Sequence, residues 1–239
     1  MSQRYFLTTP PSGSRAVLAG DEARHVARVM RARAGDGLEV FDGQGQWWTA
    51  TVTSVERSEV RLELGKCFSE PATAGPSLTL AVALPKGERQ KWLIEKLTEL
   101  GVARLVPLQT VHGVAEPTTA AIERLRRSVI EAYKQCGRCR LLEITDPSPL
   151  SALTSLAPTA LRLLADPGGV PPAAAATPTG GDLLVAIGPE GGFTAEEVAT
   201  AEAAGFQRVS LGPHILRIET AAIAMAAIAG QPTCPTSAC

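Results

Sequence analysis

The hydrophobic and polar positions of the first 70 residues alternate in short runs that predict a β-rich unit. Alternating or β-branched runs, typical of half-buried strands, cover residues 4–8, 15–19, 37–42, 46–55 and 59–64. The sequence Asp-Gly-Gln-Gly between the third and fourth runs predicts a hairpin. Residues 21–33 instead place Val26, Val29 and Met30 on one helical face. Five short strands and one helix predict a small barrel, a shape often used to bind RNA.

The rest of the chain alternates continuous apolar runs with runs at helical spacing. Residues 70–77 are rich in Pro, Ala, Gly and Ser and predict a linker. Buried strands are predicted at 78–84, 104–108, 140–144, 160–166, 183–187 and 208–211. Helices are predicted at 88–100, 119–136, near 150–156, at 195–204 and in a last segment ending near Gly230. Strands that alternate with helices predict an α/β domain with a mainly parallel sheet covered on both faces.

The turns after two of these strands are unusual. Residues 187–194 read IGPEGGFT and residues 211–221 read LGPHILRIETA. Ligands of open α/β sheets bind beyond the carboxyl ends of the strands, and glycines let a flat ligand approach main-chain groups. The glycine spacing fits neither a GxxxxGK[ST] nor a GxGxxG motif, which disfavours a triphosphate or dinucleotide site. A tight strand-to-helix turn, with Thr194 and Glu197 as a capping box, is the alternative, but two adjacent Gly-Pro turns favour a cleft.

Charge is distributed unevenly along the chain. The formal net charge is −1, yet residues 85–145 carry a net +4 and residues 146–239 a net −5. A polyanion can dock on part of such a molecule, although solvated helix faces explain the same charges. Irregularly spaced cysteines, no signal-peptide pattern and no apolar run of membrane-spanning length predict a reducing, cytoplasmic setting without a membrane. Cys136 and Cys139 form a lone CxxC, so no metal is expected.

Five ordered motifs resemble those of the RsmE family. They are LPKGER (84–89), EKLTELGV (95–102), RSVIEAYKQCGR (127–138), IGPEGGFT (187–194) and LGPHILRIETA (211–221). RYFL near the start, HVARVMRARAGD and the Asp-Gly-Gln-Gly hairpin resemble the PUA-like barrel of that family, so the resemblance covers nearly the whole chain. RsmE proteins are methyltransferases of the SPOUT superfamily that modify N3 of a uridine in small-subunit (16S) ribosomal RNA.

The resemblance implies a PUA-like barrel at 1–72, a trefoil-knotted SPOUT domain at 76–231 and a flexible tail at 232–239. It also implies S-adenosylmethionine as cofactor, no metal, and a homodimer with active sites at the subunit interface. The substrate is expected to be small-subunit ribosomal RNA or the assembled small subunit. The family usually has arginine where this chain has His214, which puts a role of that arginine in doubt, and we expect His214 to be a surface imidazole.

Placement in the two Gly-Pro loops predicts Arg217, Glu219 and Glu190 as catalytic residues. Cofactor contacts are predicted for Leu164, Ile187, Gly188, Pro189, Gly191, Gly192, Leu211, Gly212, Ile215 and Leu216. RNA contacts are predicted for Arg4, Arg28, Arg31, Arg33, Lys86, Arg89 and Arg138. Three alternatives stay open: a non-catalytic RNA-binding protein that kept the fold, a methyltransferase of the same superfamily that acts on another RNA, and a small-molecule enzyme.

Overall fold

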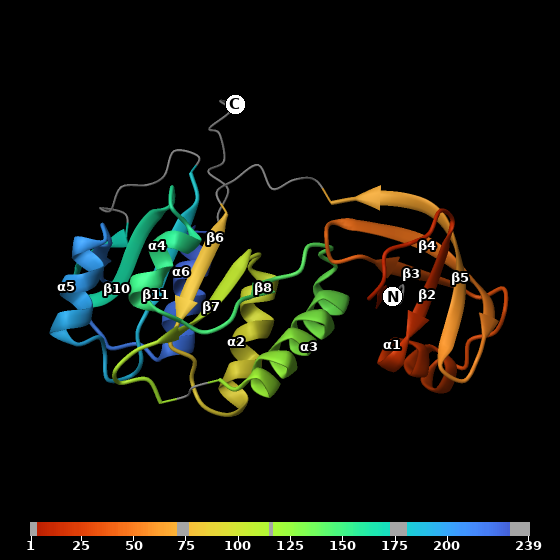
Figure 1. The fold of residues 1–239 in the computed structure, drawn as a ribbon, viewed down its shortest axis with the longest axis horizontal. Coiled ribbons are helices and arrows are strands. Elements are labelled where there is room, and N and C mark those ends of the chain that lie inside the picture. The colour runs from red at the N-terminus through yellow and green to blue at the C-terminus, as the bar shows by residue number, and fades with distance from the viewer. Residues whose placement is uncertain (1–3, 71–76, 115–116, 173–180, 230–239) are drawn as a thin grey trace. The chain divides into compact units, whose positions relative to one another are not determined.

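The structure is a computed structural model that describes residues 4–70, 77–114, 117–172 and 181–229 (Figure 1). The chain divides into two compact units: Met1–Ala72 with Tyr133–Leu141, and Thr73–Ala132 with Leu142–Cys239. The sequence placed residues 133–141 in the second domain, whereas they group with the first unit. Most of the predicted linker at 70–77 lies outside the described residues. The predicted tail at 232–239 lies outside the described residues.

The first unit is built on a sheet of alternating exposed and buried positions. Within the described residues its strands are β1 (Arg4–Phe6), β2 (Arg15–Ala19), β3 (Gly37–Phe41), β4 (Gln46–Val55) and β5 (Glu59–Ser69). They are ordered β1-β3-β4-β5-β2, and the β1–β3 pair is parallel whereas the other pairs are antiparallel. The curled sheet surrounds one apolar cluster that includes Leu18, Val26, Val40 and Leu62. The predicted β-rich unit and its hairpin are confirmed.

The helix of this unit is shorter than predicted. Helix α1 spans Gly20–Arg24 and continues as one turn of π-helix, His25–Val29, instead of running to residue 33. The chain leaves the helix at Arg31, which has a φ of 52°, and the Ala32 amide donates to the Val26 oxygen at 3.1 Å. A left-handed residue cannot continue an α-helix. The wider turn leaves Val29 66% exposed.

Residues 133–141 form hydrogen bonds with the hairpin that connects β3 and β4 of the first unit. The Gly45 amide donates to the Cys139 oxygen at 2.8 Å, and the Leu141 amide donates to the Gly43 oxygen at 2.9 Å. A Cβ atom on Gly43 would lie 2.6 Å from the Leu141 side chain. The glycines of the hairpin therefore serve this close approach as well as the turn. Only Glu143–Ile144 of the strand predicted at 140–144 pairs in the second unit, as β8.

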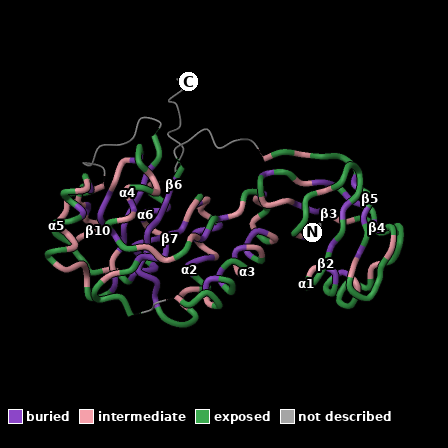
Figure 2. Tube along the Cα trace, viewed as in Figure 1, coloured by how far each residue is buried: buried purple, intermediate pink, exposed green. Residues whose placement is uncertain are grey.

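The second unit contains a parallel sheet, as predicted. The described strands are ordered β12-β10-β11-β6-β7-β8, with β9 paired to β7, and each of these pairs is parallel. Their bounds are β6 (Leu78–Val82), β7 (Arg104–Gln109), β8 (Glu143–Ile144), β9 (Ser148–Pro149), β10 (Leu161–Val170), β11 (Leu183–Ile187) and β12 (Gln207–Val209). Strands β6 and β11 are buried along their entire length (Figure 2), which explains their continuous apolar runs.

Helices cover both faces of this sheet. They are α2 (Glu88–Glu99), α3 (Thr119–Cys136), α4 (Leu153–Leu156), α5 (Ala195–Ala203) and α6 (Ile218–Ala229), with a short 3₁₀ turn at Leu150–Ala152. On one face, Leu153 and Ala201 pack with strand residues such as Leu164 and Leu184 in one cluster. Helix α6 packs on β6 and β11 and against α2. No described helix is long and apolar enough to cross a membrane.

Candidate functional site

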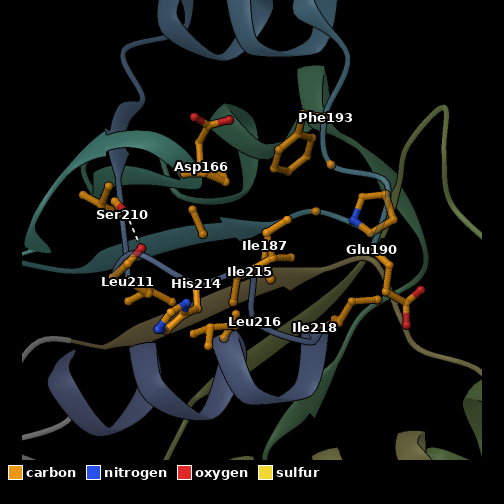
Figure 3. Close-up of a pocket in the computed structure, with 18 residues that line it drawn as sticks. Asp166, Ile187, Glu190, Phe193, Ser210, Leu211, His214, Ile215, Leu216 and Ile218 are labelled. Atoms are coloured by element: carbon orange, nitrogen blue, oxygen red, sulfur yellow. Dashed lines mark hydrogen bonds between the residues drawn. The ribbon is translucent and has the colours of Figure 1, made fainter.

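A cavity lies at the carboxyl ends of β10, β11 and β12, where the sequence predicted a cleft between two Gly-Pro turns (Figure 3). The polar side chains in its lining are those of Asp166, Glu190, Ser210 and His214, and the other lining residues are apolar or glycine. Such a lining suits a ligand with a flat apolar part that is oriented by a few polar and main-chain groups. Helix α6 closes one side through Ile218 and Ala221.

Eight of the ten predicted cofactor residues line this cavity. They are Ile187, Gly188, Pro189, Gly192, Leu211, Gly212, Ile215 and Leu216. Leu164 is fully buried in the core below the cavity, and Gly191 does not line it. Leu164 alternates with lining residue Ala165 along β10, so its side chain belongs to the opposite face of the sheet. For these two residues a contact with the cofactor stays a prediction.

The glycines of the first loop, Gly188–Gly192, each have a local structural reason. A Cβ atom on Gly188 would lie 2.9 Å from the ring of Phe193, and one on Gly191 would lie 3.2 Å from His112 Cβ. Gly192 has a φ of 71°, which disfavours other residues. The sequence suggested that a ligand comes close to these glycines. The groups that crowd Gly188 and Gly191 are instead side chains of the protein.

Capping of the following helix is as predicted. The Thr194 side chain accepts from the Glu197 amide at 3.1 Å, and the Glu197 side chain accepts from the Thr194 amide at 2.8 Å. This capping box satisfies two amides that α5 leaves unpaired and fixes where the glycine loop ends. The loop is thereby anchored at its helix end.

Several lining residues were missed by the sequence reasoning. They are Ala165, Asp166, Pro167, Phe193, Val209, Ser210, Ile218 and Ala221. Asp166 accepts from Arg208 Nη2 at 2.5 Å and from the Gly168 amide at 2.8 Å, so its carboxylate is held in place. Its position as the last residue of the predicted strand 160–166 was the available signal. His214 is exposed, as predicted, but it also lines the cavity.

The predicted catalytic residues divide into two glutamates that share one partner, Arg89, and a separate arginine. Glu190 lines the cavity and accepts from Arg89 Nη1 at 3.0 Å. The same Arg89 atom lies 3.6 Å from Oε1 of Glu219, whose side chain is only 7% exposed. Hydrogen bonding to Glu190, and then the charge of Glu219, raise the pKa of Arg89. Arg217 is exposed, and the ion pair found for Glu219 among the described residues is with Arg89.

Glu219 and Thr220 lie inside the first turn of α6, since that helix starts at Ile218. Neither residue is therefore the N-cap of this helix. The Ala221 amide donates to the Arg217 oxygen at 2.9 Å, which places Arg217 at the helix entry. Among the described residues, no hydrogen-bond donor reaches Oε2 of Glu219, although this atom is buried. Buried carboxylate oxygens without a donor are uncommon.

The predicted RNA-binding residues differ in their exposure and in whether they are paired with carboxylates. Arg4 donates to Glu39 at 2.8 Å and to the Gly137 oxygen at 2.6 Å, and it stacks over Trp47. Arg4 therefore links residues 133–141 to β3, and its contact with RNA stays a prediction. Arg138, 3.8 Å from Glu70, and Arg89 are also paired with carboxylates. The exposed members of the predicted set are Arg28, Arg31, Arg33 and Lys86.

Comparisons with known proteins match the chain in two parts. A family described as an RNA methyltransferase domain matches residues 73–230, and an RNA methyltransferase PUA domain matches residues 18–65. Ribosomal RNA small subunit methyltransferase E of Mycobacterium tuberculosis is 32% identical over 235 residues, which cover 94% of this chain and 89% of the relative.

Two solved structures are similar over nearly the whole chain. The crystal structure of a ribosomal RNA small subunit methyltransferase E from Neisseria gonorrhoeae bound to S-adenosyl methionine has a TM-score of 0.85 and 27% identity, covering 95% of this chain and 96% of that chain. A methyltransferase from Legionella pneumophila with bound cofactor SAM has a TM-score of 0.86 and 28% identity, with the same coverage.

Proposed function

This chain belongs to the RNA methyltransferase family that includes ribosomal RNA small subunit methyltransferase E, and on that premise we propose that it transfers a methyl group from S-adenosylmethionine to N3 of a uridine in small-subunit ribosomal RNA. The observation that carries the proposal is the cavity between the loops after β11 and β12, where eight predicted cofactor residues meet. The activity belongs in the cytoplasm, where its RNA substrate is found.

The cavity fits the cofactor in its chemistry. Its apolar walls, among them Ile187, Leu211 and Leu216, suit an adenine ring, and its glycines leave main-chain groups accessible. The cofactor supplies an activated methyl group on a sulfonium, so the protein needs to provide neither a metal ion nor a covalent nucleophile. The described residues contain no cluster of three metal-binding side chains. Positioning of the uridine is then the main contribution of the protein.

Proton removal from uridine N3 requires an acceptor at the cavity. N3 is a poor nucleophile while it holds its proton. Of the two predicted carboxylates, Glu190 lines the cavity and its side chain is 43% exposed, so the uracil ring can approach it directly. We assign Glu190 as the proton acceptor. Glu219 takes the supporting role, because it shares Arg89 with Glu190, and Arg217 at the entry to α6 stabilises negative charge on the base carbonyls.

RNA binding is assigned mainly to the first unit. Arg28, Arg31 and Arg33 are exposed on and after the π-helical turn, beside the exposed side chains of Val29 and Met30. Guanidinium groups bind phosphates, and exposed apolar side chains can contact unstacked bases. Lys86 adds a positive charge at the loop before α2. The substrate is either naked ribosomal RNA or the assembled small subunit.

A homodimer remains part of the proposal, as does the trefoil knot. Ile215 on the cavity loop is 86% exposed, Ile228 on α6 is 54% exposed and Trp92 on α2 is 46% exposed. Helices α2 and α6 pack together, so exposed apolar side chains on them and on the nearby loop favour burial against another subunit. Sedimentation measurements on the full chain test this part.

Calorimetry with S-adenosylmethionine tests the cofactor site. The wild-type chain is expected to bind one equivalent, and Ser210→Tyr, which places a ring in the cavity, is expected to bind none. Ser54→Tyr, on β4 of the other unit, is the control and should bind normally. Equal binding by all three proteins places the cofactor elsewhere. Binding without methyl transfer to any RNA favours the non-catalytic alternative.

A further inference from the structure

The loop after β7, residues 110–114, contacts the glycine loop Gly188–Gly192 without lining the cavity. His112 Nδ1 lies 3.2 Å from the main-chain oxygen of Gly192, a lining residue. His112 Cβ also lies 3.2 Å from the position that a Cβ atom on Gly191 would take. His112 thus touches two consecutive residues of the glycine loop. The absence of a side chain at residue 191 is what allows this approach.

The chemistry of this contact fixes the direction of the hydrogen bond. A main-chain carbonyl only accepts, so Nδ1 of His112 must carry the proton. The same nitrogen is a donor in the Nδ1-protonated neutral ring and in the imidazolium, so the bond is available in both. The Gly192 amide in turn donates to the Pro189 oxygen at 2.9 Å and closes the turn of the glycine loop. His112 therefore holds the carbonyl end of a residue whose amide end is already fixed.

A second hydrogen bond joins the same two loops. The Val111 amide donates to Oε1 of Glu197 at 2.9 Å, and the other oxygen of this carboxylate accepts from Thr194 at 2.8 Å. One carboxylate therefore caps α5 and ties the 110–114 loop to it. His112 and Val111 are adjacent, so their two bonds fix the loop at neighbouring points. The glycine loop is held from the helix side and from the β7 side.

We propose that His112 is a positioning residue that keeps the glycine loop in the conformation that binds the cofactor. This inference rests on the proposed function of the cavity. Gly188, Pro189, Glu190 and Gly192 all line the cavity, so a shift of this loop changes the wall against which the cofactor lies. His112 acts through Gly191 and Gly192 and is not itself a lining residue of the cavity.

Hydrogen exchange on the cofactor-free full chain tests the hold of His112. In His112→Ala, amides in the peptide 188–194 should exchange about five-fold faster, the effect of one ordinary hydrogen bond. His112→Asn should restore the wild-type rate, because its side-chain amide can donate from a similar position. Val111→Ala is the control, since it keeps the main-chain donor. Exchange in His112→Ala at the wild-type rate, or in His112→Asn as fast as in His112→Ala, overturns the inference.

Titration with S-adenosylmethionine separates this inference from the proposed function. His112→Ala should bind the cofactor about five-fold more weakly than wild type, and His112→Asn should bind it normally. If the wild type binds the cofactor and His112→Ala binds it with the same affinity, only the proposed role of His112 is wrong. A wild-type chain that binds no cofactor contradicts the proposed function and, with it, the role of His112 in cofactor binding, whatever the exchange rates show.

Discussion

Arg89 Nη1 lies 3.6 Å from Oε1 of Glu219, a carboxylate that is almost entirely removed from solvent. The same guanidinium holds Glu190 at the cavity, so one side chain from α2 links the glycine loop to the first turn of α6. A buried carboxylate without its cation is strongly unfavourable. The arrangement thus connects the stability of α6 with the geometry of the cavity.

Arg89→Met should therefore lower both the melting temperature and methyl transfer, because Glu219 loses its counter-charge and Glu190 loses its orientation. The double variant Arg89→Met with Glu219→Gln should recover much of the melting temperature, since the buried charge is gone. Transfer should stay low in the double variant. Thermal unfolding and a methylation assay measure the two effects. If Arg89→Met has the melting temperature of wild type, the proposed link between Arg89 and Glu219 is wrong.

Gly188→Ala should destabilise the protein and weaken cofactor binding. The added methyl group would lie 2.9 Å from the Phe193 ring, and this ring lines the cavity. Overpacking of this kind costs about 1–3 kcal/mol. Gly37→Ala is the matched control, because its methyl group would meet no atom within 4 Å. Denaturant unfolding and calorimetry measure the effects, and equal behaviour of the two variants would contradict the packing argument.

Removal of the arginines after α1 should weaken RNA binding and reduce its dependence on salt. Each arginine that binds a phosphate contributes about 1 to the slope of log affinity against log salt, so its removal should make that slope shallower by this amount. Arg28→Ala, Arg31→Ala and Arg33→Ala are compared with Arg57→Ala, which changes an exposed arginine at the turn between β4 and β5. Filter binding at several salt concentrations provides the slopes. Identical slopes for all four variants and wild type would place the RNA elsewhere.

Cys139 should be alkylated far more slowly than the exposed Cys67. Burial raises the pKa of the Cys139 thiol to about 11, and the thiolate is the reactive form. At a pH of about 8 only about one thiol in a thousand is ionised, and burial blocks access as well. Labelling of Cys139 should rise as the pH approaches 11. Peptide mass spectrometry after timed alkylation gives the rates, and rapid labelling of Cys139 at the lower pH would show that residues 133–141 are not packed as described.

Much of the fold follows from local pattern. The strands at 15–19, 46–55 and 183–187 have the predicted bounds, because alternation and continuous apolar runs report burial directly. Residues 140–144 were predicted less well. Leu141 pairs with Gly43, nearly 100 positions away in sequence, and no periodicity within a short window contains such a partner.

The candidate site was likewise predicted in part from local pattern and in part not. Its location follows from the rule on strand ends and from two Gly-Pro turns. The roles of single residues depend on contacts between distant segments. Arg89 was expected at RNA and pairs with Glu190 and Glu219, and His112, which carried no motif, holds the glycine loop. Charge type alone does not say whether an arginine faces a phosphate or a carboxylate.

Nucleoside mass spectrometry after reaction with small-subunit ribosomal RNA tests the proposed methyl transfer to uridine N3. Unmodified RNA, both naked and in assembled small subunits, is incubated with the wild-type chain and S-adenosylmethionine and then digested to nucleosides. The wild type should make 3-methyluridine, and Ser210→Tyr should not. No methylated nucleoside from either form of the RNA, or a methyl group on a ribose or on another base, would contradict the proposed transfer.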